Sequence, residues 1–171
     1  HHSEHSEHAV RLRVPDARYA FIDAVMGQYE QNLQNDIGDF VIRRRDGLFA
    51  YQLAVVVDDA YEDVTHIVRG ADLLDSTPRQ IYLQQCLKYP QTEYMHLPLA
   101  VNTAGEKLSK QTYAAHIKTD SRVLFDALSF LGQQPPAELK HESIPYIWHW
   151  ASTHWLSQAI PKQPKILIHD H

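Results

Sequence analysis

The spacing of hydrophobic and polar positions predicts short strands in the first part of the chain. Alternating or continuous apolar runs of strand length occur at residues 10–14, 39–45, 64–69 and 94–101. Pro15 closes the first run, and the turn Asp46-Gly47 closes the second, because glycine tolerates the positive φ of a tight turn. Each run is therefore interpreted as a strand.

Helical spacing is typical of most remaining apolar segments. It predicts helices at residues 19–26, 76–89, 123–131 and 144–156. The second of these starts at Ser76-Thr77-Pro78, where a hydroxyl can cap the helix and proline suits the first turn. Gly132 is a stop signal for the third. The three tryptophans, between residues 148 and 155, predict the apolar packing of a small helical subdomain.

Two segments do not follow a single pattern. Residues 27–35 are polar and fit a loop or a loosely helical segment. Residues 50–61 contain the run VVV at 55–57, which favours a strand, but their apolar positions also recur at helical spacing, and we favour a helix. A strand, a crossover helix and a further strand indicate an α/β fold, in which ligands bind beyond the carboxyl ends of the strands.

The composition is typical of a globular chain and excludes several classes of protein. Of 171 residues, 44% are hydrophobic and 22% are charged, and the formal net charge is −5. These values exclude a disordered or fibrous chain and a surface coated with basic residues. No apolar run could cross a bilayer and no segment resembles a secretory signal, so we expect a cytoplasmic protein without a membrane partner. The single cysteine, Cys86, excludes an intramolecular disulfide framework and a Cys-type zinc site.

Histidines cluster at both ends of the chain without predicting a metal site. The chain starts with HHSEHSEH and finishes with IHDH. Imidazole can bind transition metals, but neither end has the apolar surroundings that hold a metal site rigid. We interpret both ends as polar termini and expect no metal site in this chain.

The clearest candidate chemistry lies in Lys107-Leu108-Ser109-Lys110, which follows a predicted turn at 102–105. Two lysines three positions apart can direct several N–H donors at one polyphosphate, and such compact charges suit a phosphoryl group whose charge shifts during reaction. The tetrapeptide alone is weak evidence, since an exposed basic loop could have the same sequence. It is not a P-loop, because no G-x-x-x-x-G precedes it.

Three blocks of sequence together resemble the class I glutamyl-tRNA synthetases. They are GDFVIRRRDGLFAYQLAVVVDD at 38–59, THIVRGADLLDSTPRQ at 65–80 and HLPLAVNTAGEKLSKQ at 96–111, the last being similar to the family's K-M-S-K-S-type loop. Three blocks in the family's order and spacing are far more specific than one motif. The resemblance implies a class I, Rossmann-like α/β catalytic domain and a helix at 50–61.

Within this family, the chain looks most like the glutamyl-queuosine tRNA(Asp) synthetases. Ordinary glutamyl-tRNA synthetases usually carry P-T-Y-N-F where this chain has FAYQL at 49–53, and R-G-E-D-H where it has RGADL at 69–73. They also continue into a long anticodon-binding domain, whereas residues 112–171 suffice only for a helical subdomain. The resemblance implies ATP-dependent activation of L-glutamate and its transfer to the queuosine base of tRNA(Asp).

The resemblance also implies roles for individual residues. Tyr51 and Arg69 fall at positions that bind L-glutamate, which suits a phenol and a permanently charged guanidinium. Lys110, with Lys107 and Ser109, falls in the ATP-binding loop. The two lysines would act catalytically by neutralising charge on the phosphates, with Mg²⁺ assisting.

Other polar residues near these blocks are expected to be structural. We interpret Asp58 and Asp59 as structural or capping groups, and Asp72 as a candidate to orient the arginine three residues before it. His66 and His96 are expected to be packed within the fold.

The resemblance divides the chain into three parts. Residues 1–36 would be a remnant of an inserted acceptor-binding, zinc-bearing region, 37–113 the C-terminal half of the nucleotide-binding catalytic domain, and 114–171 the helical subdomain. The family's H-I-G-H-type motif does not occur here, and its zinc element is expected upstream. We therefore expect this polypeptide alone to be inactive. A fragment of an ordinary glutamyl-tRNA synthetase and a non-catalytic tRNA-binding fragment are the alternatives.

Overall fold

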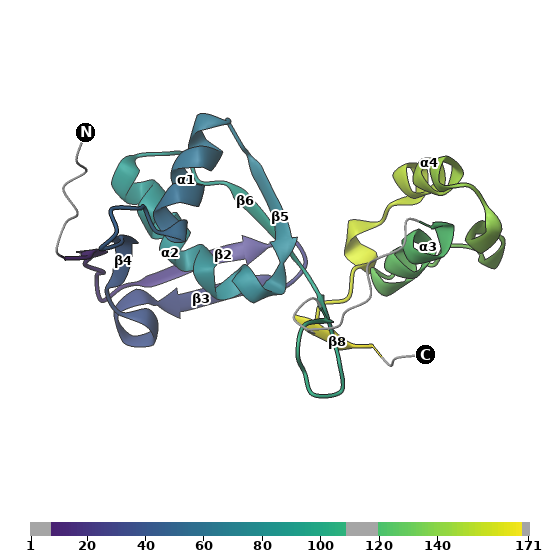
Figure 1. Cartoon of the computed structure of the whole chain (residues 1–171), viewed down its shortest axis with the longest axis horizontal. Helices are drawn as coiled ribbons and strands as arrows, with labels where there is room; N and C mark the ends of the chain where they lie inside the picture. Colours follow the sequence, from purple (N-terminus) through teal and green to yellow (C-terminus); the bar gives the residue numbers. More distant parts are fainter. Residues whose placement is uncertain (1–7, 109–119, 169–171) are drawn as a thin grey trace.

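The computed structural model describes residues 8–108 and 120–168 of the chain. Figure 1 shows a larger lobe, built from strands and helices, and a smaller lobe that contains only helices. The chain passes between the lobes through a short pair of strands, β7 (Leu99–Val101) and β8 (Lys165–Leu167), which lie parallel to each other.

The larger lobe is organised around a four-stranded mixed sheet with the order β3-β2-β6-β5. Its strands are β2 (Arg18–Asp23), β3 (Gly27–Asn32), β5 (His66–Gly70) and β6 (Glu93–Leu97). Strands β2, β6 and β5 are parallel, and β3 pairs antiparallel with β2. In the β5–β6 register, Arg69 lies opposite His96, which brings two polar residues together near the carboxyl ends of both strands.

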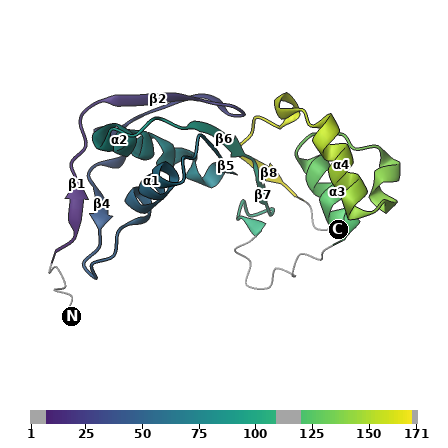
Figure 2. The same ribbon diagram turned by 90° about the horizontal axis from the view of Figure 1, so that it is seen from above.

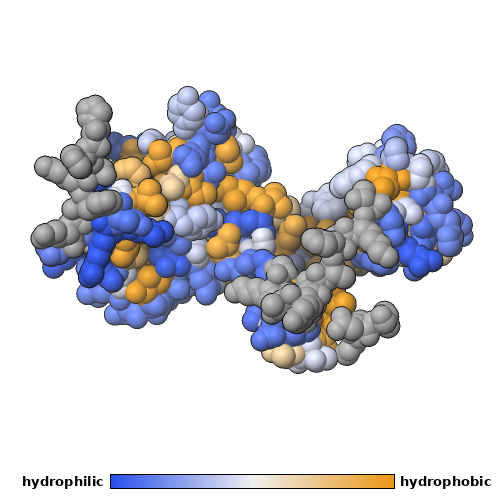
Figure 3. All heavy atoms as spheres, viewed as in Figure 1, coloured by the Kyte–Doolittle hydropathy of each residue, from blue (hydrophilic) through white to orange (hydrophobic). Residues whose placement is uncertain are grey.

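Helices α1 (Tyr51–Tyr61) and α2 (Thr77–Leu87) lie on the same side of this sheet (Figure 2). Phe21 and Tyr94 from the strands and Ile81 from α2 form a buried cluster on the covered face. The alternate positions Ile22 and Val68 are 81% and 58% exposed, because side chains of a strand alternate between its two faces. Figure 3 shows a band of hydrophobic residues across the larger lobe.

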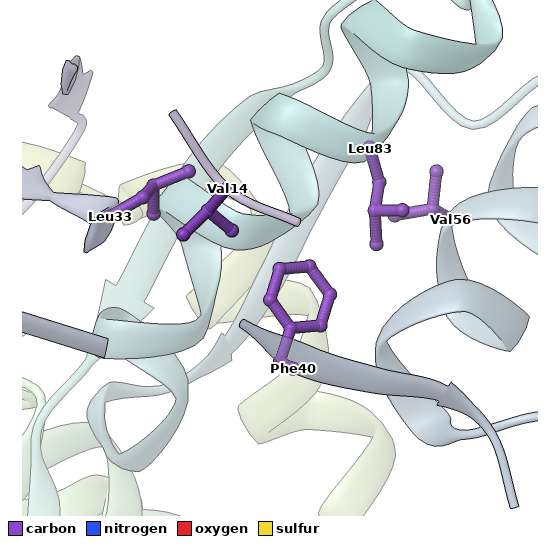
Figure 4. Packing of buried hydrophobic residues seen from close by; sticks show 5 residues of the cluster. All are labelled: Val14, Leu33, Phe40, Val56 and Leu83. Atoms are coloured by element: carbon purple, nitrogen blue, oxygen red, sulfur yellow. The ribbon is translucent and has the colours of Figure 1, made fainter. Parts of the chain in front are cut away.

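A second buried cluster joins the helices to a small antiparallel pair of strands, β1 (Val10–Leu12) and β4 (Phe40–Arg43). Its buried members are Val14, Leu33, Phe40, Val56 and Leu83. Figure 4 shows Val56 of α1 beside Leu83 of α2, with the ring of Phe40 directed towards them. Leu33 starts a short π-helix, Leu33–Ile37, capped by the side chain of Asn32.

The smaller lobe packs α3 (Ser121–Phe130) against α4 (Ile144–His154) through buried Leu128, Leu139, Ile147 and Ala151. Two 3-10 turns, Ala137–His141 and Ser157–Ala159, complete it. The α3 helix starts at Asp120, whose carboxylate accepts the backbone N–H groups of Arg122 and Val123. It ends in a Schellman motif, in which the N–H groups of Gly132 and Gln133 bond to the carbonyls of Ser129 and Leu128.

Several predicted elements need correction. The helix predicted at 19–26 is wrong, since residues 18–23 form β2. The segment at 27–35, predicted as a loop or a loosely helical segment, is β3 followed by the π-helix, so only its last residues are helical. Because 19–26 is apolar at most positions, its periodicity was ambiguous, and pairing with β3 and β6 decides the conformation. The strand predicted at 94–101 is interrupted at Pro98. The remaining strands and helices, including α1, are confirmed to within a few residues.

The prediction of packed tryptophans is only partly right. Trp150 packs against the core of the smaller lobe, whereas Trp148 and Trp155 are 58% and 40% exposed. They border a shallow apolar hollow beside Leu128 and Ala151.

The predicted boundary at residues 36 and 37 stays a prediction, although β2 and β3 share a sheet with β5 and β6. No helix in the described ranges 8–108 and 120–168 is long and apolar enough to span a membrane.

Candidate functional site

The carboxyl end of β5 leads into a short connection on which three neighbouring elements converge. We call residues 70–77 the η2 segment; it consists of Gly70, the 3-10 helix Ala71–Ser76 and Thr77, the first residue of α2. Side chains from the end of β5, the start of α1 and the loop after β7 all bond to it. Parallel sheets bind ligands at this end of their strands.

Arg69 is held by several partners at the end of β5. Its Nε donates to Nε2 of His96 at 3.0 Å, and its Nη2 donates to Oγ1 of Thr77 at 2.8 Å and to the carbonyl of Leu73 at 3.3 Å. The guanidinium carbon lies 5.5 Å from the centre of the Tyr94 ring. Within the described ranges, Nη1 makes no hydrogen bond to another residue, so Arg69 has donors to offer a ligand.

His96 is fully buried and links Arg69 to Asp23, as expected of a histidine packed within the fold. The Oδ2 atom of Asp23 lies 2.6 Å from Nδ1 of His96, and the carboxylate also accepts the backbone N–H groups of His96, Val25 and Met26. Burial acts to raise the pKa of Asp23, but these hydrogen bonds outweigh it and leave the pKa below its ordinary value.

The packing predicted for His66 is wrong. Its ring is largely exposed at the start of β5, where it contacts Thr65 and the carboxylate of Glu93, 3.3 Å away. This position is the opposite end of the strand from Arg69, so His66 is remote from the η2 segment.

Tyr51 is the first residue of α1 and is half exposed. The next residue, Gln52, fixes this helix end: its Nε2 donates to Oγ of Ser76 at 3.1 Å, and its Oε1 accepts from Gln80 at 2.8 Å. Because Ser76 is adjacent to Thr77, which binds Arg69, the start of α1 and the end of β5 attach to neighbouring residues.

Lys107 reaches the η2 segment from the loop after β7. Its Nζ lies 3.0 Å from Oδ2 of Asp72, and both side chains are more than a third exposed. Asp72 pairs with Lys107, and Arg69 donates hydrogen bonds to His96, Leu73 and Thr77, so the role of Asp72 in orienting Arg69 stays a prediction. Ser109 and Lys110, the other predicted ATP-binding residues, lie outside the described residues.

A pocket of about 410 Å³ opens beside this ion pair. Its walls are formed by Asp72, Leu99, Val101, Gly105, Glu106, Lys107 and Lys165. Lys165 comes from β8, so the last strand brings a second ammonium group to the pocket. The sequence reasoning missed Lys165, and nothing in the pattern around it indicates a site.

Sequence comparison decides the family of the chain. The family described as "tRNA synthetases class I (E and Q), catalytic domain" matches residues 1–129. The chain belongs to this family.

Relatives of this class I catalytic domain are similar over nearly the whole chain. The glutamyl-Q tRNA(Asp) synthetase of Dechloromonas aromatica is 54% identical over 162 residues, which are 94% of this chain and 54% of the relative. That of Aromatoleum aromaticum is 56% identical over 160 residues, 92% of this chain and 50% of the relative. The chain thus spans about half the length of the curated relatives it matches.

Two solved structures support the α/β fold predicted for the class I domain. A glutamate tRNA ligase from Elizabethkingia meningosepticum, in complex with its amino acid, has a TM-score of 0.68 at 20% identity, covering 91% of this chain and 35% of that one. A glutamate-tRNA synthetase from Elizabethkingia anophelis has a TM-score of 0.69 at 19% identity, covering 92% and 36%. These likenesses confirm the fold class.

Potential metal-ligating side chains are scattered rather than grouped in the part of the class I domain that the structure describes. Within residues 8–108 and 120–168, no three His, Cys, Asp or Glu side chains gather in a way that could ligate an ion. Cys86 is exposed.

Asp59 has a raised pKa, because burial outweighs the opposing effect of the Arg69 charge.

Proposed function

We propose that this chain supplies part of the active site of an ATP-dependent ligase that activates L-glutamate and transfers it to the queuosine base of tRNA(Asp). The observation that carries the proposal is the convergence of Arg69, the start of α1 and Lys107 on the η2 segment. The choice of substrates is supported by the identity of 54% to a glutamyl-Q tRNA(Asp) synthetase.

In this proposal, Arg69 and Tyr51 bind L-glutamate. The Nη1 group of Arg69 can donate to a carboxylate oxygen, because Nε and Nη2 are already engaged within the protein. The Tyr51 hydroxyl, on a half-exposed ring at the start of α1, can add a directed hydrogen bond.

Lys107, Lys110 and Ser109 would bind the phosphates of ATP, which enters with Mg²⁺ as part of the substrate. A glutamate carboxylate oxygen attacks the α-phosphorus, and pyrophosphate leaves with the bonding electrons, giving glutamyl-adenylate. A hydroxyl of queuosine then attacks the activated carbonyl, loses its proton, and displaces AMP. Orientation and charge neutralisation supply most of the rate in such a sequence.

The pocket beside Lys107 offers two ammonium groups to a phosphate. Lys107 and Lys165 line it together with the carboxylates of Asp72 and Glu106. The pairing of Lys107 with Asp72 would hold its ammonium group in place until a phosphate competes for it.

The whole protein that contains this chain tests the proposal. It should exchange labelled pyrophosphate into ATP only when glutamate is present, and should load labelled glutamate onto queuosine-containing tRNA(Asp). Arg69→Gln should raise the KM for glutamate about 10- to 100-fold, which corresponds to the loss of one charge-assisted hydrogen bond. The matched control Arg122→Gln, at an exposed position on α3, should leave it unchanged.

Three outcomes would contradict the proposal in different ways. Loading of tRNA(Glu) in place of queuosine-containing tRNA(Asp) would assign an ordinary glutamyl-tRNA synthetase. Absence of exchange and loading in the whole protein would remove the enzymatic function. An unchanged KM in Arg69→Gln would remove Arg69 from the glutamate site.

A further inference from the structure

We propose that Asp23 and His96 are positioning residues that orient Arg69 for glutamate by fixing which nitrogen of the His96 ring carries the proton. The inference rests on the proposed function, because it assumes that Arg69 binds the substrate. Neither Asp23 nor His96 would touch glutamate, since both are buried, at 2% and 0% exposed.

The orientation starts at Asp23, the last residue of β2. Its Oδ1 accepts the backbone N–H groups of Val25 and Met26 at 3.0 and 2.8 Å, which fixes the carboxylate at the end of the strand. Its Oδ2 accepts the backbone N–H of His96 at 3.1 Å and lies 2.6 Å from the Nδ1 atom of that ring. The carboxylate is therefore held from two sides.

The contact with Asp23 determines the protonation of the His96 ring. An ionised carboxylate can only accept, so Nδ1 of His96 must carry the hydrogen. In the neutral ring, Nε2 then has a free lone pair. This lone pair lies 3.0 Å from Nε of Arg69, which always carries a hydrogen and can only donate. The donor–acceptor sequence runs in one direction, from Arg69 through His96 to Asp23.

The ring of His96 in turn fixes the plane of the guanidinium. Arg69 is planar, so a bond at Nε to His96 and bonds at Nη2 to Thr77 and Leu73 leave it little rotational freedom. Tyr94 supports one face of the same plane at 5.5 Å. The Nη1 group, which makes no hydrogen bond within residues 8–108 and 120–168, is thereby pre-oriented, which reduces the entropy lost when a carboxylate binds.

A purely structural role for Asp23 makes a different prediction from the positioning role, and Asp23→Asn separates them. The asparagine oxygen should stay with the N–H groups of Val25 and Met26, which places its NH₂ group against Nδ1 of His96. The ring must then accept at Nδ1 and carry its hydrogen on Nε2. Nε of Arg69 then loses its acceptor, because two donors at 3.0 Å repel each other, while the relocated hydrogen can be accepted by Oγ1 of Thr77, 3.3 Å from Nε2.

The first measurement uses the whole protein that contains this chain, first in its unsubstituted form and then in two variants. Nitrogen-15 NMR distinguishes a protonated ring nitrogen from a bare one, and the His96 signals are assigned by their absence in His96→Leu. We expect a protonated Nδ1, a bare Nε2 and a scalar coupling across the hydrogen bond from Nε of Arg69. In Asp23→Asn the two ring nitrogens should exchange these states. A bare Nδ1 in the wild-type ring would overturn the proposal.

The second measurement uses glutamate-dependent pyrophosphate exchange by the whole protein. Asp23→Asn should raise the KM for glutamate on the order of 10- to 100-fold, as expected for a misplaced binding group, and leave the KM for ATP within about twofold. Asp126→Asn, at an exposed position on α3, is the matched control and should change neither constant.

Two further variants separate this inference from the proposed function. His96→Gln can place its amide oxygen where Nε2 was and should retain much of the glutamate affinity, whereas His96→Leu should not. Asp23→Asn combined with Arg69→Gln should be no worse than Arg69→Gln alone, because both act through one group. If Arg69→Gln raises the KM for glutamate and Asp23→Asn does not, the positioning role is wrong and the proposed function stands. If Arg69→Gln itself has no effect, both fail.

Discussion

Gly132 gives a sharp test of how the smaller lobe is held together. It follows the C-cap of α3 with a φ of +73°, the left-handed conformation that completes the Schellman motif. A Cβ atom at this position would lie 2.2 Å from the carbonyl oxygen of Ala159 and 3.5 Å from Cδ of Pro161. The substitution Gly132→Ala therefore meets both a conformational and a steric penalty.

A second glycine, Gly27, allows the conformational penalty to be measured without the steric penalty. Gly27 has a similar φ of +80°, but a Cβ atom there would have nothing within 4 Å. The conformational cost of alanine at positive φ is about 1–2 kcal/mol, offset by about 0.4–1 kcal/mol of lost freedom in the unfolded chain. The clash adds about 1–3 kcal/mol, because a backbone carbonyl must move. We expect Gly132→Ala to cost about 2–4 kcal/mol and Gly27→Ala about 1 kcal/mol.

Urea unfolding measures both costs. Far-UV circular dichroism reports the whole chain, and tryptophan fluorescence reports the smaller lobe, because all three tryptophans lie between residues 148 and 155. Gly132→Ala should lower the midpoint of the fluorescence transition strongly. Equal losses of stability in Gly132→Ala and Gly27→Ala would show that a Cβ atom at position 132 does not clash with the carbonyl oxygen of Ala159. That result would refute the predicted steric penalty.

Three further predictions concern burial and charge. In urea unfolding, Ile147→Ala should lower the free energy of unfolding by about 2–5 kcal/mol, because the Ile147 side chain is 0% exposed. Tyr146 is 55% exposed, so Tyr146→Ala should change the same free energy by about 0.5 kcal/mol. Asp72→Asn should cost less than about 1 kcal/mol by the same assay, since both side chains of its ion pair with Lys107 are more than a third exposed to solvent. The pKa of Asp23 is lower in the folded protein than in the unfolded chain, where it is about 3.9. The ionised carboxylate therefore stabilises the folded state fully above the unfolded pKa, and this stabilisation is lost as pH falls through the lower pKa of the folded state. The difference in stability between wild type and Asp23→Asn should therefore shrink between pH 6 and pH 3, and a constant difference would contradict it.

Local signals were sufficient for most of the fold. The helix α2 follows from the start signal at Ser76-Thr77-Pro78, and the end of α3 follows from Gly132. The strand β2 could not be predicted, because the four apolar residues between its charged ends show no alternation and its conformation depends on pairing with β3 and with β6, which is far along the chain. Long-range pairing is invisible to a local pattern.

The candidate site shows the same division. Arg69, Tyr51 and Lys107 were predicted from blocks of sequence, and each lies on or beside an element that contacts the η2 segment. Their buried support was missed. A single aspartate within the apolar run at 19–26 was the available signal, since a charge in such a run is expensive unless it is paired. Its partner, His96, is far away in sequence and could only be identified from the fold.

The pairing of β8 with β7 has a consequence for the order in which the protein can assemble. Both helices of the smaller lobe lie between these strands in the chain, so β8 leaves the ribosome after every other wall of the 410 Å³ pocket. Long-range strand pairing has to await loop closure, whereas helix pairs form from local contacts. The pocket that receives Lys165 is thus the last part of the fold to close, and a proteolytic cut between α4 and β8 would separate the Lys165 wall from the rest of the pocket.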